Sequence, residues 1–124
     1  MEIVTVVGAR PQFVKAAPVS REFLHRAEIT EFLVHTGQHF DAALSAQQFD
    51  ALGLPPPKVN LGIRGGATTD ALGRMLQALD QVLADLAPDV LLVYGDTTST
   101  LAGAIAATGR DIPVVHVEAG LRSF

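Results

Sequence analysis

The sequence predicts a doubly wound α/β fold, in which a parallel sheet carries helices on both faces. Four short runs rich in β-branched and other apolar residues, at 3–7, 29–34, 90–94 and 114–117, predict strands. Between them lie segments whose apolar residues recur every three or four positions, which is typical of helices. Apolar strands that alternate with helices indicate a parallel sheet whose connections are right-handed crossovers.

The first helix is predicted over residues 13–24, where apolar side chains recur at mixed three- and four-residue spacing. Pro18 lies inside this segment, and we expect it to kink the helix or to divide it near Ala17. A second helix is predicted from Asp41, which can cap it, to about residue 52.

Two more helices follow a connector that contains at best a short strand, residues 59–61. Residues 72–86 show a clear 3.6-residue apolar period and predict a core helix. Residues 97–100 are hydroxyl-rich and lead into an alanine-rich helix over 101–107, which we expect to pack tightly on the sheet.

Length and composition suit one globular domain, since the chain has 124 residues and 48% hydrophobic content. The formal net charge of −4 argues against general nucleic-acid or anionic-membrane binding but allows a phosphate ligand. The chain has no cysteine, which excludes disulfides and thiolate catalysis. No signal-peptide pattern and no run near the roughly 20 apolar residues of a membrane span are present, so a cytoplasmic location is expected.

Polar segments follow four of the predicted strands. Ligands of open α/β sheets bind beyond the carboxyl ends of the strands. We therefore expect these segments to converge on one rim of the sheet; they are residues 8–15, 36–39, 95–100 and 116–122.

Two cations and one acid stand out on this rim. Arg10 and Lys15 begin the first helix and suit a diphosphate, although both are equally compatible with solvated surface cations. The segment is neither a GxGxxG dinucleotide fingerprint nor a P-loop. Asp96 is either a helix cap or first-turn acid, or a carboxylate that positions or deprotonates a sugar.

The remaining candidates lie in the second and last rim segments. Glu118 is either a partner for Arg122 or a cap, or a general acid or base. His116 lies in an apolar run and is expected to be a hydrogen-bonded core histidine, whereas His39, beside Gln38 on a loop, is the better ligand candidate. The histidines show no close-spaced pair such as HExxH, so no metal site is expected.

Taken together, the four rim segments resemble a known enzyme family, the non-hydrolysing UDP-N-acetylglucosamine 2-epimerases. The matching segments appear in the family's order and spacing over nearly the whole chain. They are GARPQFVKAAP at 8–18, HTGQHFD at 35–41, VYGDTTST at 93–100 and HVEAGLRS at 116–123.

This resemblance implies a glycosyltransferase-B type fold with two Rossmann-like domains, of which residues 1–124 form the N-terminal one and the C-terminal UDP-binding domain is absent. It implies interconversion of UDP-N-acetylglucosamine and UDP-N-acetylmannosamine, by elimination of UDP across C1–C2 and its re-addition on the other face. It also implies no cofactor and no metal, a homodimer formed through the N-terminal domain, and a role in cell-envelope polysaccharide biosynthesis.

The resemblance assigns roles to individual residues. Asp96, Glu118 and Lys15 match catalytic residues, and Arg10 matches an arginine near the diphosphate. Gln38 and His39 are the substrate-binding candidates in the second segment. A further acidic residue, a later histidine and the second domain of the family are missing from the sequence, so the chain alone is expected to be inactive.

The sequence also departs from the family pattern. Much of the family has Thr-Arg-Pro-Glu where this chain has Ala9-Arg10-Pro11-Gln12, and an Arg-Gln pair associated with allosteric binding is not evident near residues 64–67. The segment from Ala9 to Phe13, residues 61–63 and Tyr94 look closer to a branch acting on UDP-2,3-diacetamido-2,3-dideoxyglucuronate, so the sugar stays open. A glycosyltransferase, a hydrolysing epimerase and a non-catalytic binding or dimerisation domain are the alternatives.

Overall fold

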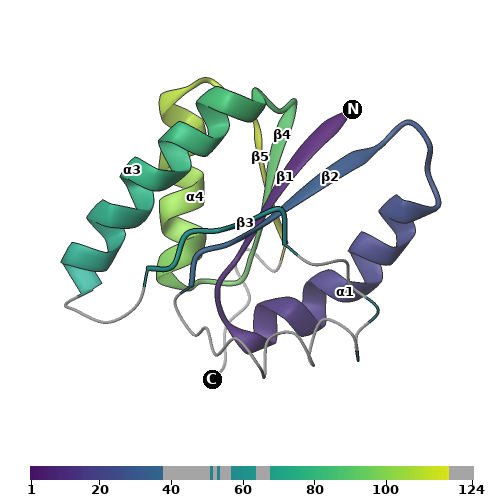
Figure 1. Ribbon diagram of the computed structural model, residues 1–124, viewed down its shortest axis with the longest axis horizontal. Coiled ribbons are helices and arrows are strands. Elements are labelled where there is room, and N and C mark those ends of the chain that lie inside the picture. Colours follow the sequence, from purple (N-terminus) through teal and green to yellow (C-terminus); the bar gives the residue numbers. More distant parts are fainter. Residues whose placement is uncertain (38–50, 52, 54–56, 64–67, 118–124) are drawn as a thin grey trace.

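The computed structural model describes residues 1–37, 51, 53, 57–63 and 68–117, without the side chain of Arg10. It contains one parallel five-stranded sheet of order β3-β2-β1-β4-β5 (Figure 1). The strands are β1 (Glu2–Val7), β2 (Thr30–His35), β3 (Val59–Asn60), β4 (Val90–Tyr94) and β5 (Val114–Val117). The predicted α/β class and each predicted strand are confirmed.

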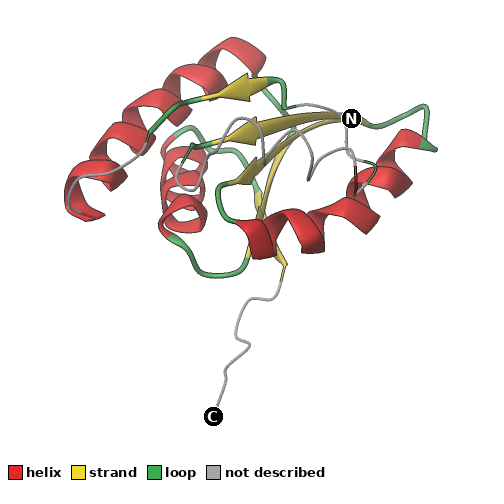
Figure 2. Ribbon diagram, turned by 60° about the horizontal axis from the view of Figure 1, so that its bottom comes forward, coloured by secondary structure: helices red, strands yellow, loops and turns green. Residues whose placement is uncertain are grey.

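Helices cover both faces of the sheet (Figure 2). Helix α1 (Arg10–Leu24) lies on one face, and α3 (Thr68–Leu86) packs beside α4 (Thr98–Gly109) on the other. The predicted helix from Asp41 to about residue 52 falls almost wholly outside the described residues. No helix in the described part of the chain is both long and apolar enough to cross a bilayer.

The register places β1 at the centre. Val6 of β1 is aligned with Val34 of β2 on one side and with Val93 of β4 on the other, both in parallel. Because side chains alternate along a strand, Val4 and Val6 face α3 and α4, while Ile3 and Val7 face α1.

The apolar layer under α3 and α4 is the larger one. Met75, Leu79 and Leu83 of α3 are buried in it, and each such side chain contributes roughly 1.5–3 kcal/mol on burial. Small residues of α4 let that helix approach the sheet closely, since a Cβ atom at Gly103 would lie 3.0 Å from Val93 Cγ1. The expected tight packing of the alanine-rich helix is confirmed.

Helix α1 forms the second apolar layer, and the predicted division of this helix near Ala17 is wrong. Phe13, Ala16 and Ala17 are buried against the sheet, and the helix continues without division through Pro18. Pro18 and Val14, one turn earlier, are both exposed. The carbonyl that proline leaves without an N–H partner therefore faces solvent, so the helix is not forced to end near Ala17.

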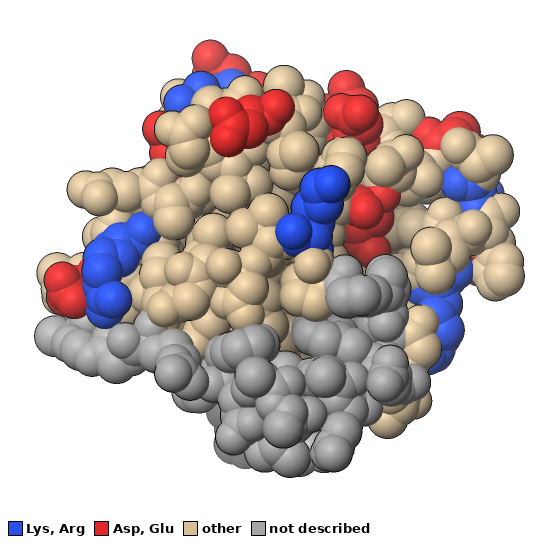
Figure 3. Space-filling model, viewed as in Figure 1, with Lys and Arg blue, Asp and Glu red and all other residues tan. Residues whose placement is uncertain are grey.

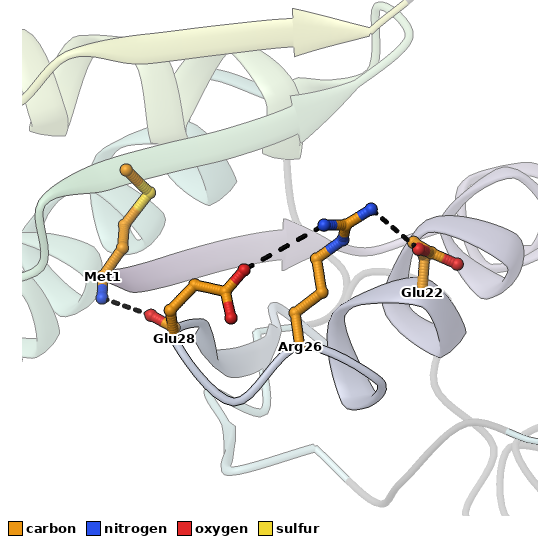
Figure 4. Close-up of polar contacts among 4 residues, drawn as sticks. All are labelled: Met1, Glu22, Arg26 and Glu28. Atoms are coloured by element: carbon orange, nitrogen blue, oxygen red, sulfur yellow. Dashed lines mark hydrogen bonds and ion pairs between the residues drawn. The ribbon is translucent and has the colours of Figure 1, made fainter.

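Charged contacts occupy the amino edge of the sheet, opposite the rim. The N-terminal ammonium of Met1 donates to the Glu28 carbonyl oxygen at 2.6 Å, and Arg26 pairs with Glu22 at 3.1 Å (Figure 4). On the face seen in Figure 3, acidic and basic side chains of the described residues are interspersed, without a broad basic patch.

One ion pair joins the two neighbouring helices. Arg110, just after α4, donates through Nε to Asp80 Oδ1 at 2.6 Å and through a terminal nitrogen to Asp80 Oδ2 at 3.0 Å. The hydrogen bond from Arg110 lowers the pKa of Asp80 below its ordinary value, and the charge of Arg110 adds to the effect. Both side chains are exposed, so the net contribution to stability is small.

The pH dependence of this ion pair can be predicted. A depressed carboxyl pKa stabilises the fold above the ordinary value of about 3.9, and the contribution is lost as the pH falls through the lower folded value. Asp80→Asn is expected to lower the melting temperature slightly at pH 7, and the difference is expected to shrink as the pH falls through the lowered pKa of Asp80. Thermal melts from pH 2 to 7 measure this, with Asp85→Asn as a control that removes a nearby charge. A difference of the same size at pH 7 and at pH 2 would contradict the assignment.

The Tyr94 hydroxyl supplies a second prediction. The side chain is fully buried under α1, and its hydroxyl has no hydrogen-bond partner among the described residues. Because a buried unsatisfied hydroxyl costs about 1–3 kcal/mol, Tyr94→Phe is expected to preserve stability or to raise it by about 1 kcal/mol. Urea denaturation tests this, and a loss above about 1 kcal/mol would show that the hydroxyl is partnered.

Candidate functional site

The parallel strands bring three of the predicted rim segments to one edge of the sheet. At this edge the chain leaves β1 towards α1 and leaves β4 towards α4, on opposite faces, which is the switch point where open α/β sheets bind ligands. The Thr36 hydroxyl lies 2.9 Å from the Ser99 hydroxyl, and the Thr36 amide donates to the Val7 carbonyl at 3.0 Å. The segments after β1, β2 and β4 therefore meet here.

Gln12 connects the start of α1 to the end of β1. It is 3% exposed, and its Oε1 accepts from the amides of Gly8 at 2.7 Å and Ala9 at 3.1 Å. Ala9 is the N-cap residue of α1 and has no side-chain oxygen to offer the first-turn amides. Gln12 satisfies the amides of the two residues that precede the helix.

The same side chain reaches the turn between β4 and α4. Gln12 Nε2 donates to the Tyr94 carbonyl at 2.8 Å and lies 2.8 Å and 3.0 Å from the hydroxyls of Thr97 and Thr100. Thr97 is the N-cap of α4 and accepts from the Thr100 amide at 3.4 Å. One buried amide thus joins the beginnings of two helices on opposite faces of the sheet.

Gly8 is where the segments approach most closely. A Cβ atom at this position would lie under 3.0 Å from both the Ser99 and the Thr36 hydroxyl oxygens. Only glycine fits between these two hydroxyls without displacing one of them.

The segment after β2 is held by a buried histidine and a glycine. His35 Nδ1 accepts from the Gly37 amide at 2.7 Å, and its ring lies 5.0 Å from the Phe13 ring. Gly37 has a φ of 90°, and a Cβ there would lie 2.7 Å from the Ile63 amide nitrogen. Residue 37 is therefore fixed at the point where the chain turns towards Gln38 and His39, which lie outside the described residues.

Asp96 lies at the exposed tip of the turn between β4 and α4. Its side chain is exposed, Gly95 before it has a φ of 69°, and Thr97 after it caps the helix. The interpretation of Asp96 as a helix cap or first-turn acid is therefore wrong, because the Thr97 hydroxyl fills the capping position. The carboxylate is left at the rim.

His116 corrects another prediction. It is hydrogen-bonded, because its Nε2 contacts the Gly95 carbonyl oxygen, but it is exposed rather than part of the core. The reason is that β5 is an edge strand paired only with β4 among the described residues. The histidine thus connects β5 to the turn that carries Asp96.

The other predicted residues are only partly described. Lys15 has an exposed side chain in the second turn of α1, and Arg10 begins the same helix. Glu118 follows the last described residue of β5 and, like Gln38 and His39, lies outside the described residues. The structure therefore places the cationic start of α1 and the Asp96 turn on one edge.

Gln12 was not predicted as a site residue, although within the described part of the chain it contacts the segments after both β1 and β4. A glutamine three residues after an N-cap is half of a capping-box signal. The other half is missing because Ala9 stands where serine or threonine would complete the pattern. No sequence pattern indicates the contacts of Gln12 with residues 94–100.

The electrostatics separate the rim from the interior. Burial raises the pKa of the Tyr94 phenol and the negative charge of Glu31 raises it further, so this hydroxyl stays protonated at neutral pH. Within the described residues no group of three or more potential metal-ligating side chains is found. Among the described rim residues, Asp96, Lys15 and His116 have exposed ionisable side chains.

This fold and rim define a doubly wound α/β protein whose polar segments meet at the switch point of the sheet. Comparison with known proteins identifies the family. The model of the UDP-N-acetylglucosamine 2-epimerase family matches residues 21–124, and the chain belongs to this family.

Individual relatives cover the whole chain. The chain is 50% identical over 124 residues to the UDP-2,3-diacetamido-2,3-dideoxy-D-glucuronate 2-epimerase of Pseudomonas aeruginosa, covering 35% of that protein. It is 41% identical to the UDP-N-acetylglucosamine 2-epimerase of Methanocaldococcus jannaschii, covering 34%. The crystal structure of the M. jannaschii enzyme in complex with UDP-GlcNAc and UDP superposes with a TM-score of 0.92 over all of this chain and 34% of that one.

These comparisons confirm the predicted family. The solved neighbours are UDP-N-acetylglucosamine 2-epimerases, which have a glycosyltransferase-B-like fold, as expected. The chain spans about a third of the length of the relatives it matches.

Gly8→Ala tests the close approach at the rim. The added methyl group must displace the Ser99 or the Thr36 hydroxyl, and overpacking of this kind costs typically 1–3 kcal/mol. Urea denaturation is expected to show a loss in that range, whereas Gly73→Ala, on α3 with open space around it, is expected to gain stability. Equal behaviour of the two variants would contradict the described approach of the rim segments.

Proposed function

We propose that the chain is the N-terminal domain of a UDP-N-acetylglucosamine 2-epimerase, which interconverts UDP-GlcNAc and UDP-ManNAc by elimination and re-addition of UDP at C1–C2. The observation that carries the proposal is the superposition of this whole chain on 34% of an epimerase solved with UDP-GlcNAc and UDP. The meeting of the rim segments at the switch point supports it.

In this proposal Asp96 acts on the sugar. Removal of an unactivated C2 proton needs a positioned carboxylate, and Asp96 is exposed on a turn that the Thr97 cap and the Gln12 contacts hold. Glu118, next in the chain after β5, supplies the second carboxylate. Gln38 and His39 contact the substrate from the segment that follows Gly37.

The cations of α1 act on the leaving group. Departure of UDP places negative charge on the diphosphate, and cations with helix amides stabilise such charge. Arg10 offers a planar fork and Lys15 a mobile point charge. Both belong to the first two turns of α1. This helix start follows Gly8 and Ala9, whose amides are hydrogen-bonded to Gln12.

The proposal extends to the whole protein. A second, UDP-gripping domain completes the site, so residues 1–124 alone are inactive. The protein forms a homodimer through this N-terminal domain and acts in the cytoplasm in cell-envelope polysaccharide biosynthesis, without a cofactor or metal. Light scattering of the chain tests the dimer.

The sugar has a second candidate. The alternative is UDP-2,3-diacetamido-2,3-dideoxy-D-glucuronate, the sugar named for a relative that is 50% identical to this chain. Incubation of the full-length protein with each UDP-sugar, followed by product analysis, decides between them. Transfer to an acceptor or release of free N-acetylmannosamine would instead indicate a glycosyltransferase or a hydrolysing enzyme.

Asp96→Asn tests the proposed chemistry in the full-length protein that carries this chain. Loss of a general base is expected to slow incorporation of solvent deuterium at C2 by about 10²- to 10⁴-fold, because the amide cannot accept the proton. Mass spectrometry of the UDP-sugar measures it. Asp85→Asn, an acid-to-amide change on exposed α3, is the matched control and is expected to exchange normally. Unchanged exchange in Asp96→Asn would remove Asp96 from the mechanism.

A further inference from the structure

The contacts of Gln12 have a single possible orientation. The Gly8 and Ala9 amides can only donate, so they must face Oε1, and the Tyr94 carbonyl can only accept, so it must face Nε2. The Thr100 hydroxyl donates its proton to the same Tyr94 carbonyl at 2.7 Å. The network therefore requires an acceptor on one side of residue 12 and a donor on the other.

An amide meets this requirement and a carboxylate does not. A carboxylate at position 12 can still accept from the two amides at the start of α1, but it places negative charge against the Tyr94 carbonyl oxygen, 2.8 Å from the present Nε2. In a full capping box, an N-cap threonine and an acid three residues later satisfy the helix start within the helix itself. With Ala9 at the N-cap, this chain instead extends residue 12 across to β4.

We propose that Gln12 is a positioning residue that fixes the spacing between the start of α1 and the turn that carries Asp96. Through Gly8 and Ala9 it holds the helix that presents Arg10 and Lys15, and through Tyr94 and Thr97 it holds the neighbour of Asp96. The group that receives the diphosphate and the group that acts at C2 are thereby kept at one separation. This consequence for catalysis rests on the proposed function.

The burial of Gln12 makes this connection rigid. Gln12 is only 3% exposed, and the contacts of its Nε2 with Tyr94 and Thr100 are buried as well. Water competes poorly for such bonds, and an unsatisfied member costs about 1–3 kcal/mol. The two helix starts therefore cannot separate without breaking several bonds together.

The structural part of the proposal is tested on this chain by NMR. The side-chain amide protons of Gln12 are expected to exchange with solvent at least tenfold more slowly than those of exposed Gln77, because protection follows burial and hydrogen bonding. Equal exchange rates for Gln12 and Gln77 would overturn the proposal whatever the enzyme does.

The catalytic part is tested in the full-length protein with two variants. Ala9→Thr/Gln12→Glu restores a capping box at α1 but lacks the donor towards Tyr94, so kcat is expected to fall about tenfold or more while KM changes much less. Gln12→Glu alone is expected to regain kcat as the pH falls, because the protonated carboxyl can again donate one hydrogen bond. Gln77→Glu, the matched control on α3, is expected to keep the activity and pH profile of the unmodified protein.

The outcomes separate this proposal from the proposed function. A full-length protein without epimerase activity would reject the function, while the exchange rates of Gln12 would still decide whether the connection exists. A folded double variant with unchanged kcat would overturn the positioning role even in an active epimerase. A kcat that falls without recovery of Gln12→Glu at low pH would also count against it, because the donor would then not be the missing element.

Discussion

The rim of this domain depends on one buried hydrogen-bonded side chain at the point where the chain leaves β1 and β4 in opposite directions. A switch point places two helix starts side by side, but sheet hydrogen bonds alone do not fix the distance between them. Gln12 supplies that constraint, since its amide is bonded to both starts. The Thr36–Ser99 contact around Gly8 adds the segment after β2 to the same unit.

The polar contacts of the domain differ in kind between its two ends. At the amino edge and between α3 and α4 they are exposed ion pairs such as Arg110–Asp80, which water and salt weaken. At the rim they are buried, mostly neutral bonds among Gln12, Thr100 and backbone groups. Neutral donors and acceptors hold the backbone without the desolvation cost of buried charge, while the ionisable side chain of Asp96 stays exposed at the rim.

The fold was predicted well because, in the strands and in α3, the residues that form the apolar pattern of the sequence are the residues that are buried. Strands such as β4 are buried on both faces and appear in the sequence as short continuous apolar runs. These runs are easily told apart from α3, whose apolar residues recur with a period of 3.6 residues. The errors fell where local rules compete with tertiary position. Pro18 follows the rule for helix breaking, yet its lost hydrogen bond faces solvent. His116 sits among apolar neighbours, yet its strand is at the edge.

Only two features allowed the candidate site to be predicted from the sequence: the convergence of loops at one edge of a parallel sheet, and the resemblance to a family. Parallel topology alone places Asp96 and the start of α1 on one edge. It does not indicate that Thr97 rather than Asp96 caps α4, since both residues are good caps and the choice depends on the turn at Gly95. Gln12 was missed because its partners lie more than 80 positions away along the chain.

The geometry of the proposed reaction explains why one sheet edge forms only part of such a site. Inversion at C2 requires a proton to leave one face of the sugar and another to arrive on the opposite face. In the proposed function, the rim contacts a bound sugar from one side, and the exposed Asp96 acts from that side. In the proposed function, Glu118 and a surface of the second domain supply the groups for the other face. The relatives, about three times the length of this chain, have the additional residues that such a surface requires.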